Sequence, residues 1–167
     1  MKSVMAVLER GYTLIEILIV MVIISIVAMT AVLSIHVNDN RRLSALAHEI
    51  ANLISLTEEE ALLRPAVLAF VPSQQGFGFV KYDNDKHQWQ ALLQKPLDTH
   101  VLPNDIELIL KIHDKVVPVD SAPQLIFSTN GDITPFIILL GIKDKPSHYQ
   151  ITGESNGEIR VETTHTE

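Results

Sequence analysis

The apolar residues of the chain are most concentrated near the N-terminus. From Ile17 to Ile35 there are 19 consecutive residues without a charge. Three of them are polar: Ser25, Thr30 and Ser34. A helix rising about 1.5 Å per residue would make this run roughly 28 Å long, which is close to the hydrocarbon thickness of a bilayer. The run therefore predicts a transmembrane helix.

A second helical pattern follows the uncharged run. Its apolar residues recur at spacings of three and four: Leu43, Leu46, Ala47, Ile50, Leu53 and Ile54, with Ala61 and Leu62 extending the series. Arg64-Pro65 is a suitable stop, because the residue before a proline disfavours helix. We expect one long helix, or two nearly collinear ones, from about Thr13 to Leu63, with Asn38–Asn40 as a possible break. The C-terminal apolar stripe should pack on a sheet.

After Pro65 the pattern becomes that of short strands separated by turns. Strands are predicted at residues 66–71, 77–82, 88–93, 106–113, 125–128, 133–140, 149–152 and 158–163. The Asn130-Gly131 and Asn156-Gly157 pairs are hairpin signals between the last two pairs of strands. The predicted fold is α+β: a long N-terminal transmembrane helix packed on an antiparallel β-sheet or sandwich.

Charge and cysteine content exclude several classes of function. The formal net charge is −7, and the residues from His36 onward carry it, with 18 acidic residues against 11 Lys and Arg. A negative domain is repelled by phosphate backbones, so no nucleic-acid partner is expected. The chain has no cysteine, which excludes disulfides and thiolate metal sites but does not decide the compartment.

The residues of the N-terminus limit the kinds of segment that it can form. A secretory signal peptide does not fit, because the apolar run is too long and Ser34-Ile35-His36-Val37 is not a small-x-small cleavage site. A plain single-pass anchor fits by length, but Glu16 then costs on the order of 2–3 kcal/mol near a helix centre, and less towards an end. Arg10 is the nearest cation for a local pair. On these grounds alone, a single-pass membrane anchor remains an alternative.

A short motif narrows the interpretation of the N-terminus further. It is Arg10-Gly11-Tyr12-Thr13-Leu14-Ile15-Glu16. Together with the apolar run it resembles the N-terminal motif of type IV pilins and of the pseudopilins of type II secretion systems. The resemblance implies that a prepilin peptidase cleaves between Gly11 and Tyr12 and N-methylates Tyr12, although the family most often has Phe there. It also implies that Glu16, at the fifth mature position, receives the N-terminal charge of a neighbouring subunit during assembly.

The C-terminal region narrows the resemblance to the H-class minor pseudopilins. The similar blocks are Phe77-Gly78-Phe79, Trp89-Gln90, Leu102-Pro103 and Pro123-Gln124-Leu125-Ile126-Phe127 with Gly131-Asp132-Ile133-Thr134-Pro135-Phe136. The resemblance implies a type II secretion subunit in the bacterial inner membrane, with other minor pseudopilins and the major pseudopilin as partners. The expected segments are a leader (1–11), a transmembrane helix (12–35), its amphipathic continuation (36–64) and a periplasmic β-rich domain (65–167). Positive charges flank the membrane run on both sides, so the periplasmic placement rests on the resemblance.

No arrangement of residues predicts an enzyme, a metal or a cofactor. The seven histidines lack ligand spacing, and an EF-hand calcium loop starting at Asp83 would place Gln88 and Gln94 where glycine and glutamate are needed. Glu58-Glu59-Glu60 is interpreted as a solvated helical face rather than a docking patch. Two alternatives stay open: a minor type IV pilin in surface pili or DNA uptake, and a periplasmic enzyme or binding protein on an uncleaved anchor.

Overall fold

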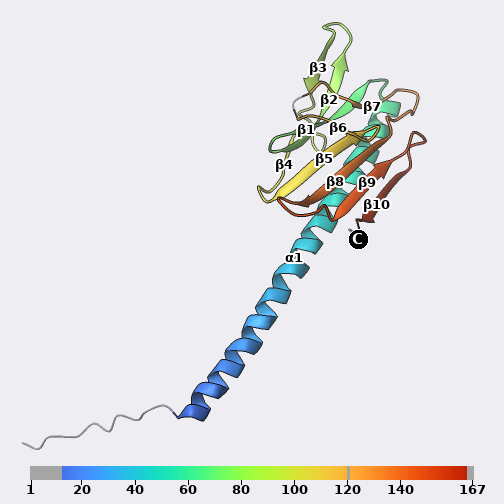
Figure 1. Ribbon diagram of the computed structural model, residues 1–167. Helices are drawn as coiled ribbons and strands as arrows, with labels where there is room; N and C mark the ends of the chain where they lie inside the picture. The colour runs from blue at the N-terminus through green and yellow to red at the C-terminus, as the bar shows by residue number, and fades with distance from the viewer. Residues whose placement is uncertain (1–12, 120, 165–167) are drawn as a thin grey trace, which may run out of the picture. The chain divides into compact units, whose positions relative to one another are not determined.

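A single long helix begins the described part of the chain. The computed structural model describes residues 13–119 and 121–164, without the side chains of residues 30–38. Helix α1 (Leu14–Leu63) includes Asn38–Asn40, so the chain is helical where a break was considered (Figure 1). This confirms the predicted long helix. By its internal contacts the chain forms two units, Met1–Asp39 and Asn40–Glu167, which are described separately below.

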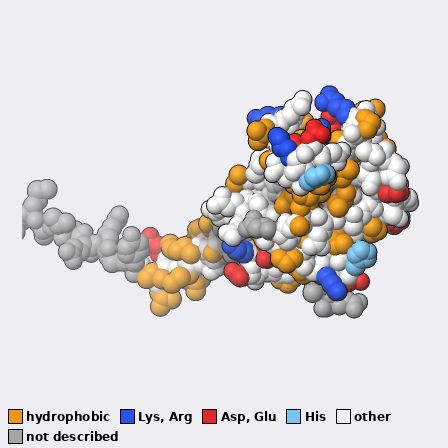
Figure 2. All heavy atoms as spheres, turned by 90° about the horizontal axis from the view of Figure 1, so that it is seen from above, with side chains coloured by type: hydrophobic (Ala, Val, Ile, Leu, Met, Phe, Trp, Pro, Cys, Tyr) orange, Lys and Arg blue, Asp and Glu red, His pale blue; other side chains and the backbone are white. Residues whose placement is uncertain are grey.

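The first unit exposes apolar side chains on every side of its helix. Each large apolar side chain from Leu14 to Met29 is at least 47% exposed, and Figure 2 shows them as an orange surface. The Ser25 hydroxyl donates to the Met21 carbonyl at 2.8 Å, so this polar side chain is satisfied within the helix. Among the described residues, no helical stretch is both long and apolar enough to cross a membrane.

The second unit holds two antiparallel five-stranded sheets (Figure 1). The first has the order β3-β2-β1-β7, with β4 also paired to β2. The second has the order β10-β9-β8-β5-β6. The strands of the first sheet are β1 (Leu68–Ser73), β2 (Gly76–Asp83), β3 (Gln88–Ala91), β4 (His100–Val101) and β7 (Leu125–Phe127). Those of the second are β5 (Ile106–Ile112), β6 (Lys115–Val116), β8 (Phe136–Ile142), β9 (Tyr149–Gly153) and β10 (Ile159–Thr163).

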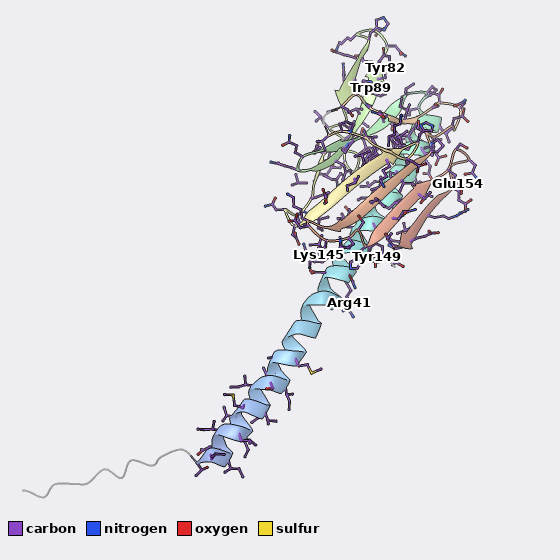
Figure 3. The ribbon with its side chains drawn as sticks, in the orientation of Figure 1. Arg41, Tyr82, Trp89, Lys145, Tyr149 and Glu154 are labelled. Atoms are coloured by element: carbon purple, nitrogen blue, oxygen red, sulfur yellow. The ribbon has the colours of Figure 1, made fainter. Side chains whose placement is uncertain are left out.

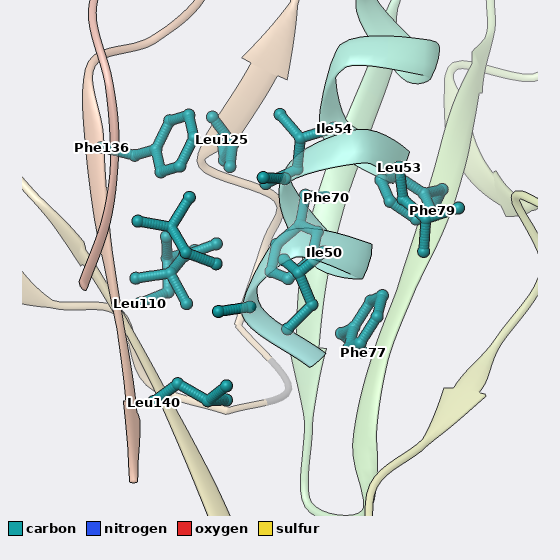
Figure 4. Packing of buried hydrophobic residues seen from close by; sticks show 14 of the residues in the cluster. Ile50, Leu53, Ile54, Phe70, Phe77, Phe79, Leu110, Leu125, Phe136 and Leu140 are labelled. Carbon is teal, nitrogen blue, oxygen red and sulfur yellow. The ribbon is translucent and has the colours of Figure 1, made fainter. Parts of the chain in front are cut away.

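The C-terminal part of α1 supplies the centre of the core. The predicted stripe is buried at Leu43, Ala47, Ile50, Leu53, Ile54 and Ala61. Figure 4 shows Ile50 and Ile54 between phenylalanines of the first sheet and apolar side chains of the second, among them Leu110. The stripe ends before Leu62, whose side chain is 46% exposed. The predicted packing of the helix on a sheet is confirmed, and the helix contacts both sheets.

The Asn130-Gly131 turn closes only a short hairpin, in which the Ser128 backbone N–H donates to the Asp132 carbonyl at 3.0 Å. Strand β7 pairs with β1, whereas β8 pairs with β5 and β9, so the turn carries the chain from one sheet to the other. One bridge, between Phe127 and Ile133, joins the two sides of the turn. Thr134 still donates its backbone N–H to the Ile126 carbonyl, but Pro135 has no N–H to continue the ladder. The predicted turn is therefore confirmed, but the two strands that flank it continue into different sheets.

The other strand predictions are confirmed with small changes of boundary. The Asn156-Gly157 turn does join a hairpin, because β9 and β10 pair along five residues from Tyr149 to Gly153. Strands β4 and β6 were not predicted. Each is two residues long, and two residues are too few to show an alternating pattern.

Candidate functional site

The predicted processing site precedes α1 in the sequence. Gly11 and Tyr12 are outside the described residues, and Thr13 is the first described position. The Thr13 carbonyl accepts from the backbone N–H groups of Glu16 at 3.1 Å and Ile17 at 3.3 Å. The Thr13 hydroxyl accepts from the Glu16 N–H at 3.3 Å as well. Thr13 is thus the N-cap of the helix.

Sequence reasoning missed this cap, although its signal was present. Thr13 and Glu16 have the spacing of a capping box, in which a Thr side chain satisfies the N–H three residues ahead. The cap begins α1 two residues after Tyr12, the predicted mature N-terminus. Glu16 consequently lies in the first helical turn, where the positive end of the helix dipole favours a carboxylate.

The Glu16 carboxylate is exposed and available for an external cation. No residue in the described ranges 13–119 and 121–164 forms an ion pair with it. Its backbone N–H is engaged by Thr13, while its side chain stands among exposed apolar neighbours such as Ile15 and Ile17. A carboxylate in apolar surroundings gains most from a positive partner, because screening by water is weak there.

The Asp83-Asn84-Asp85 segment is a hairpin turn, as expected. Asp83 accepts from the backbone N–H groups of Asp85 at 3.0 Å and Lys86 at 3.2 Å, and from the Gln90 side chain at 2.7 Å. The backbone hydrogen bond from Lys86 is the main reason that the pKa of Asp83 lies below its usual value. Beside the turn, the rings of Tyr82 and Trp89 meet edge to face at 5.2 Å (Figure 3).

The acidic cluster near the end of α1 is only partly a solvated face. Glu59 is exposed, but Glu60 pairs with Arg64 at 3.1 Å. The Glu58 carboxylate lies against Gly157 in the β9–β10 turn. Partial burial raises the pKa of Glu58, and the charge of Glu59 adds to the rise. The predicted solvated face therefore holds at Glu59, whereas the carboxylate of Glu58 is partly buried beside the β9–β10 turn.

The described histidines are dispersed, and one of them packs on the core. In the described part of the chain, no three His, Asp or Glu side chains are placed to hold a metal ion. His100 stacks on Phe77 with ring centroids 4.9 Å apart, and its Nε2 lies 2.8 Å from the Pro96 carbonyl. Its ring therefore has a packing role.

Comparison with known proteins begins at the N-terminus. Residues 7–32 match the family described as the prokaryotic N-terminal methylation motif. Over a longer alignment, the chain is 29% identical to the type II secretion system protein H of Pseudomonas aeruginosa, with 79% of this chain and 83% of the relative aligned. It is 27% identical to the protein of the same name from Vibrio cholerae, with 91% and 93% aligned.

Two solved structures share the fold. Both are of the minor pseudopilin EpsH from the type II secretion system of Vibrio cholerae, with TM-scores of 0.65 at 20% identity and 0.61 at 22% identity. They cover 75% and 72% of this chain, and 96% of each solved chain. The prediction of an H-class minor pseudopilin is confirmed. The α+β fold expected for such a pseudopilin, with an N-terminal helix and antiparallel sheets, is confirmed as well.

Proposed function

We propose that this H-class pseudopilin is a minor subunit of the periplasmic pseudopilus that drives export of folded proteins across the outer membrane. The main support for the proposal is that one chain contains both sequence features of such a subunit. An N-terminal methylation motif matches residues 7–32, and similarity to type II secretion protein H extends over as much as 91% of the chain. Partners of the same class follow: the other minor pseudopilins and the major pseudopilin.

The subunit enters the fibre from the inner membrane. Its uncharged run continues in sequence from Ile17 to Ile35, and the described part of that helix is apolar on every side. A helix that is apolar all round needs an apolar environment, which a bilayer or a fibre of packed helices supplies. A single inner-membrane span with the β-rich domain in the periplasm is the arrangement that lets such a helix pass from one environment to the other.

Processing by prepilin peptidase makes assembly depend on Glu16. Cleavage after Gly11 leaves a methylated ammonium on Tyr12, and the N-terminal charge of a neighbouring subunit pairs with the Glu16 carboxylate. A lone carboxylate near the centre of a membrane helix costs on the order of 2–3 kcal/mol, and an opposite charge offsets this cost. The open Glu16 side chain supports this role. Pairing therefore favours the assembled fibre over the isolated subunit.

A deletion strain tests the proposed function. Loss of the gene should abolish release of secreted enzymes through the type II pathway, and leave surface pili and DNA uptake unchanged. The full-length chain supplied in trans should restore release. Intact secretion with lost pili or lost DNA uptake would instead assign the protein to a type IV pilus.

A further inference from the structure

A cavity of about 280 Å³ opens where α1 ends against the first sheet. The helix contributes Leu56, Glu60 and Arg64 to its wall. The opposite wall comes from β1, β2 and the segment that follows β3. The floor is apolar, formed by Leu56, Ala66, Leu68, Leu92 and Leu97. Two of these residues, Leu68 and Leu97, belong to the hydrophobic core. The cavity is therefore an open end of the core.

Cations surround this apolar floor. Along β2, Phe77 and Phe79 point into the core, and Lys81 has the next position on the same face. Lys81 is paired across the strands with Leu68 on one side and Gln90 on the other. Lys95 and Arg64 also line the cavity. The face of β2 that is buried at Phe77 and Phe79 therefore becomes exposed and positively charged at Lys81.

Two of the three cations remain for an external partner. Glu60 is the one carboxylate among the lining residues, and it pairs with Arg64 at 3.1 Å. Arg64 also follows the last turn of α1, where a cation complements the negative end of the helix dipole. Lys81 and Lys95 form no ion pair with any residue in the described ranges. The local charge is positive in a chain whose net charge is −7.

We propose that this cavity docks a segment of a different fibre subunit in which an acidic side chain stands next to an apolar one. The apolar residue covers the floor, and the carboxylate pairs with Lys81 and Lys95. A free inorganic anion would leave the leucines of the floor exposed. The cavity is also slightly smaller than the roughly 300–1,000 Å³ of typical small-molecule sites, which suits one or two inserted side chains. This inference rests on the proposed function, because that function supplies the partner subunits.

Photochemical cross-linking in cells tests the docking site. A benzoylphenylalanine replaces Gln94, an exposed residue that lines the cavity, in the full-length chain expressed with the complete secretion system. We expect an adduct with another pseudopilin, and its cross-linked peptide should contain Asp or Glu. The double variant Lys81→Glu and Lys95→Glu should reduce the adduct by about tenfold or more, because both attractive charges become repulsive. Lys81→Arg with Lys95→Arg should retain it.

Matched controls separate docking from folding and from general charge. The same photoreactive residue at Lys115, on β6, should give no such adduct. Lys143→Glu with Lys145→Glu reverses two exposed charges after β8, and should leave the Gln94 adduct unchanged. An adduct that persists in the Lys81→Glu, Lys95→Glu variant, an adduct only with a second copy of this chain, or no protein adduct would overturn the proposal.

The N-terminus of each sample distinguishes this proposal from the proposed function. Mass spectrometry reads whether the chain begins at methylated Tyr12. A processed chain without the adduct counts against the docking site alone. An unprocessed chain in cells with active prepilin peptidase counts against the pseudopilin function from which the partner was inferred.

Discussion

The ring of Phe136 occupies the space in which Gly153 would otherwise carry a side chain. The two residues are register partners across β8 and β9, and an added Cβ at Gly153 would overlap the ring. Phe136 is buried, and it begins β8 directly after Pro135. The contact therefore fixes the first residue of the strand that follows the crossover between the sheets. It gives a structural reason for the Thr-Pro-Phe block and for the glycine 17 positions later.

Replacing Gly153 with alanine should lower the free energy of unfolding by about 1–3 kcal/mol, because the Phe136 ring must leave its position. Urea unfolding of the detergent-solubilised full-length protein measures the change. Gly78→Ala is the matched control in another strand, since a Cβ there meets Thr99 Oγ1 at an ordinary 3.4 Å. The control should change stability by about 0.5 kcal/mol or less. Equal losses in the two variants would show that the ring contact is not the cause.

Shortening the buried stripe of α1 should destabilise the second unit strongly. Ile54→Ala should cost about 2–5 kcal/mol, because Ile54 is fully buried and its lost methyl groups leave a cavity. Leu63→Ala, in the same helix, removes a side chain that is 78% exposed and should cost about 0.5 kcal/mol or less. The same unfolding experiment reports both values. Similar losses at the two positions would contradict the packing of the helix between the sheets.

Two carboxylates should affect stability with opposite dependence on pH. Burial raises the pKa of Glu58 in the folded protein above its ordinary 4.5, so folding favours the protonated form. Its contribution is present below pH 4.5 and is lost as pH rises through the raised value. The wild type should therefore lose stability relative to Glu58→Gln across that window. An unchanged difference between the two proteins from pH 4 to neutral pH would count against the partial burial of Glu58.

Glu158 should show the opposite dependence of stability on pH. The hydrogen bond from Arg160 lowers the pKa of Glu158 below 4.5, so its contribution is present above that pH and lost as pH falls through the lowered value. The difference between wild type and Glu158→Gln should shrink on acidification, measured by urea unfolding at a series of pH values. A difference that grows on acidification would contradict the Glu158–Arg160 pair, whose atoms lie 2.8 Å apart.

Replacing Glu16 should impair assembly more than membrane insertion. Glu16→Gln removes the charge that receives a neighbouring N-terminus, while it makes the helix easier to place in a bilayer. Fractionation should find the variant in the inner membrane in normal amounts, and recovery of the variant in sheared pseudopilus fibres should fall by about tenfold or more, the factor that corresponds to a loss of about 1.4 kcal/mol. Ser25→Ala is a control in the same helix and should assemble normally. Normal incorporation of Glu16→Gln would contradict the charge-pairing role.

The helix and most strands could be predicted because their signals are local. The spacing of Ile50, Leu53 and Ile54 identified a buried face, and Pro65 identified its end. The turn at Asn130-Gly131 was predictable from the dipeptide, but the separation of its two strands into different sheets was not. Which sheet each strand joins depends on distant partners, β1 for β7 and β5 with β9 for β8. The position of Glu58 against Gly157 likewise depends on a turn far away in sequence.

The functional site also contains features that the sequence predicts and features that it does not. Residues 10–16 carried the family resemblance from a short motif, and the comparison over residues 7–32 agrees with it. The Thr13 cap could have been predicted from the three-residue spacing between Thr13 and Glu16. The cavity between α1 and β2 had no sequence signal, because Leu56, Lys81 and Lys95 come together only when the chain folds.

The mature N-terminus is the most direct test of the account. The full-length protein is purified from membranes of its native host, and its N-terminal peptide is read by mass spectrometry. We expect a chain that begins at Tyr12 with a methyl group on its amine, and that no longer contains the eleven residues that precede it. A chain that keeps Gly11, or that begins at any residue other than methylated Tyr12, would contradict this expectation.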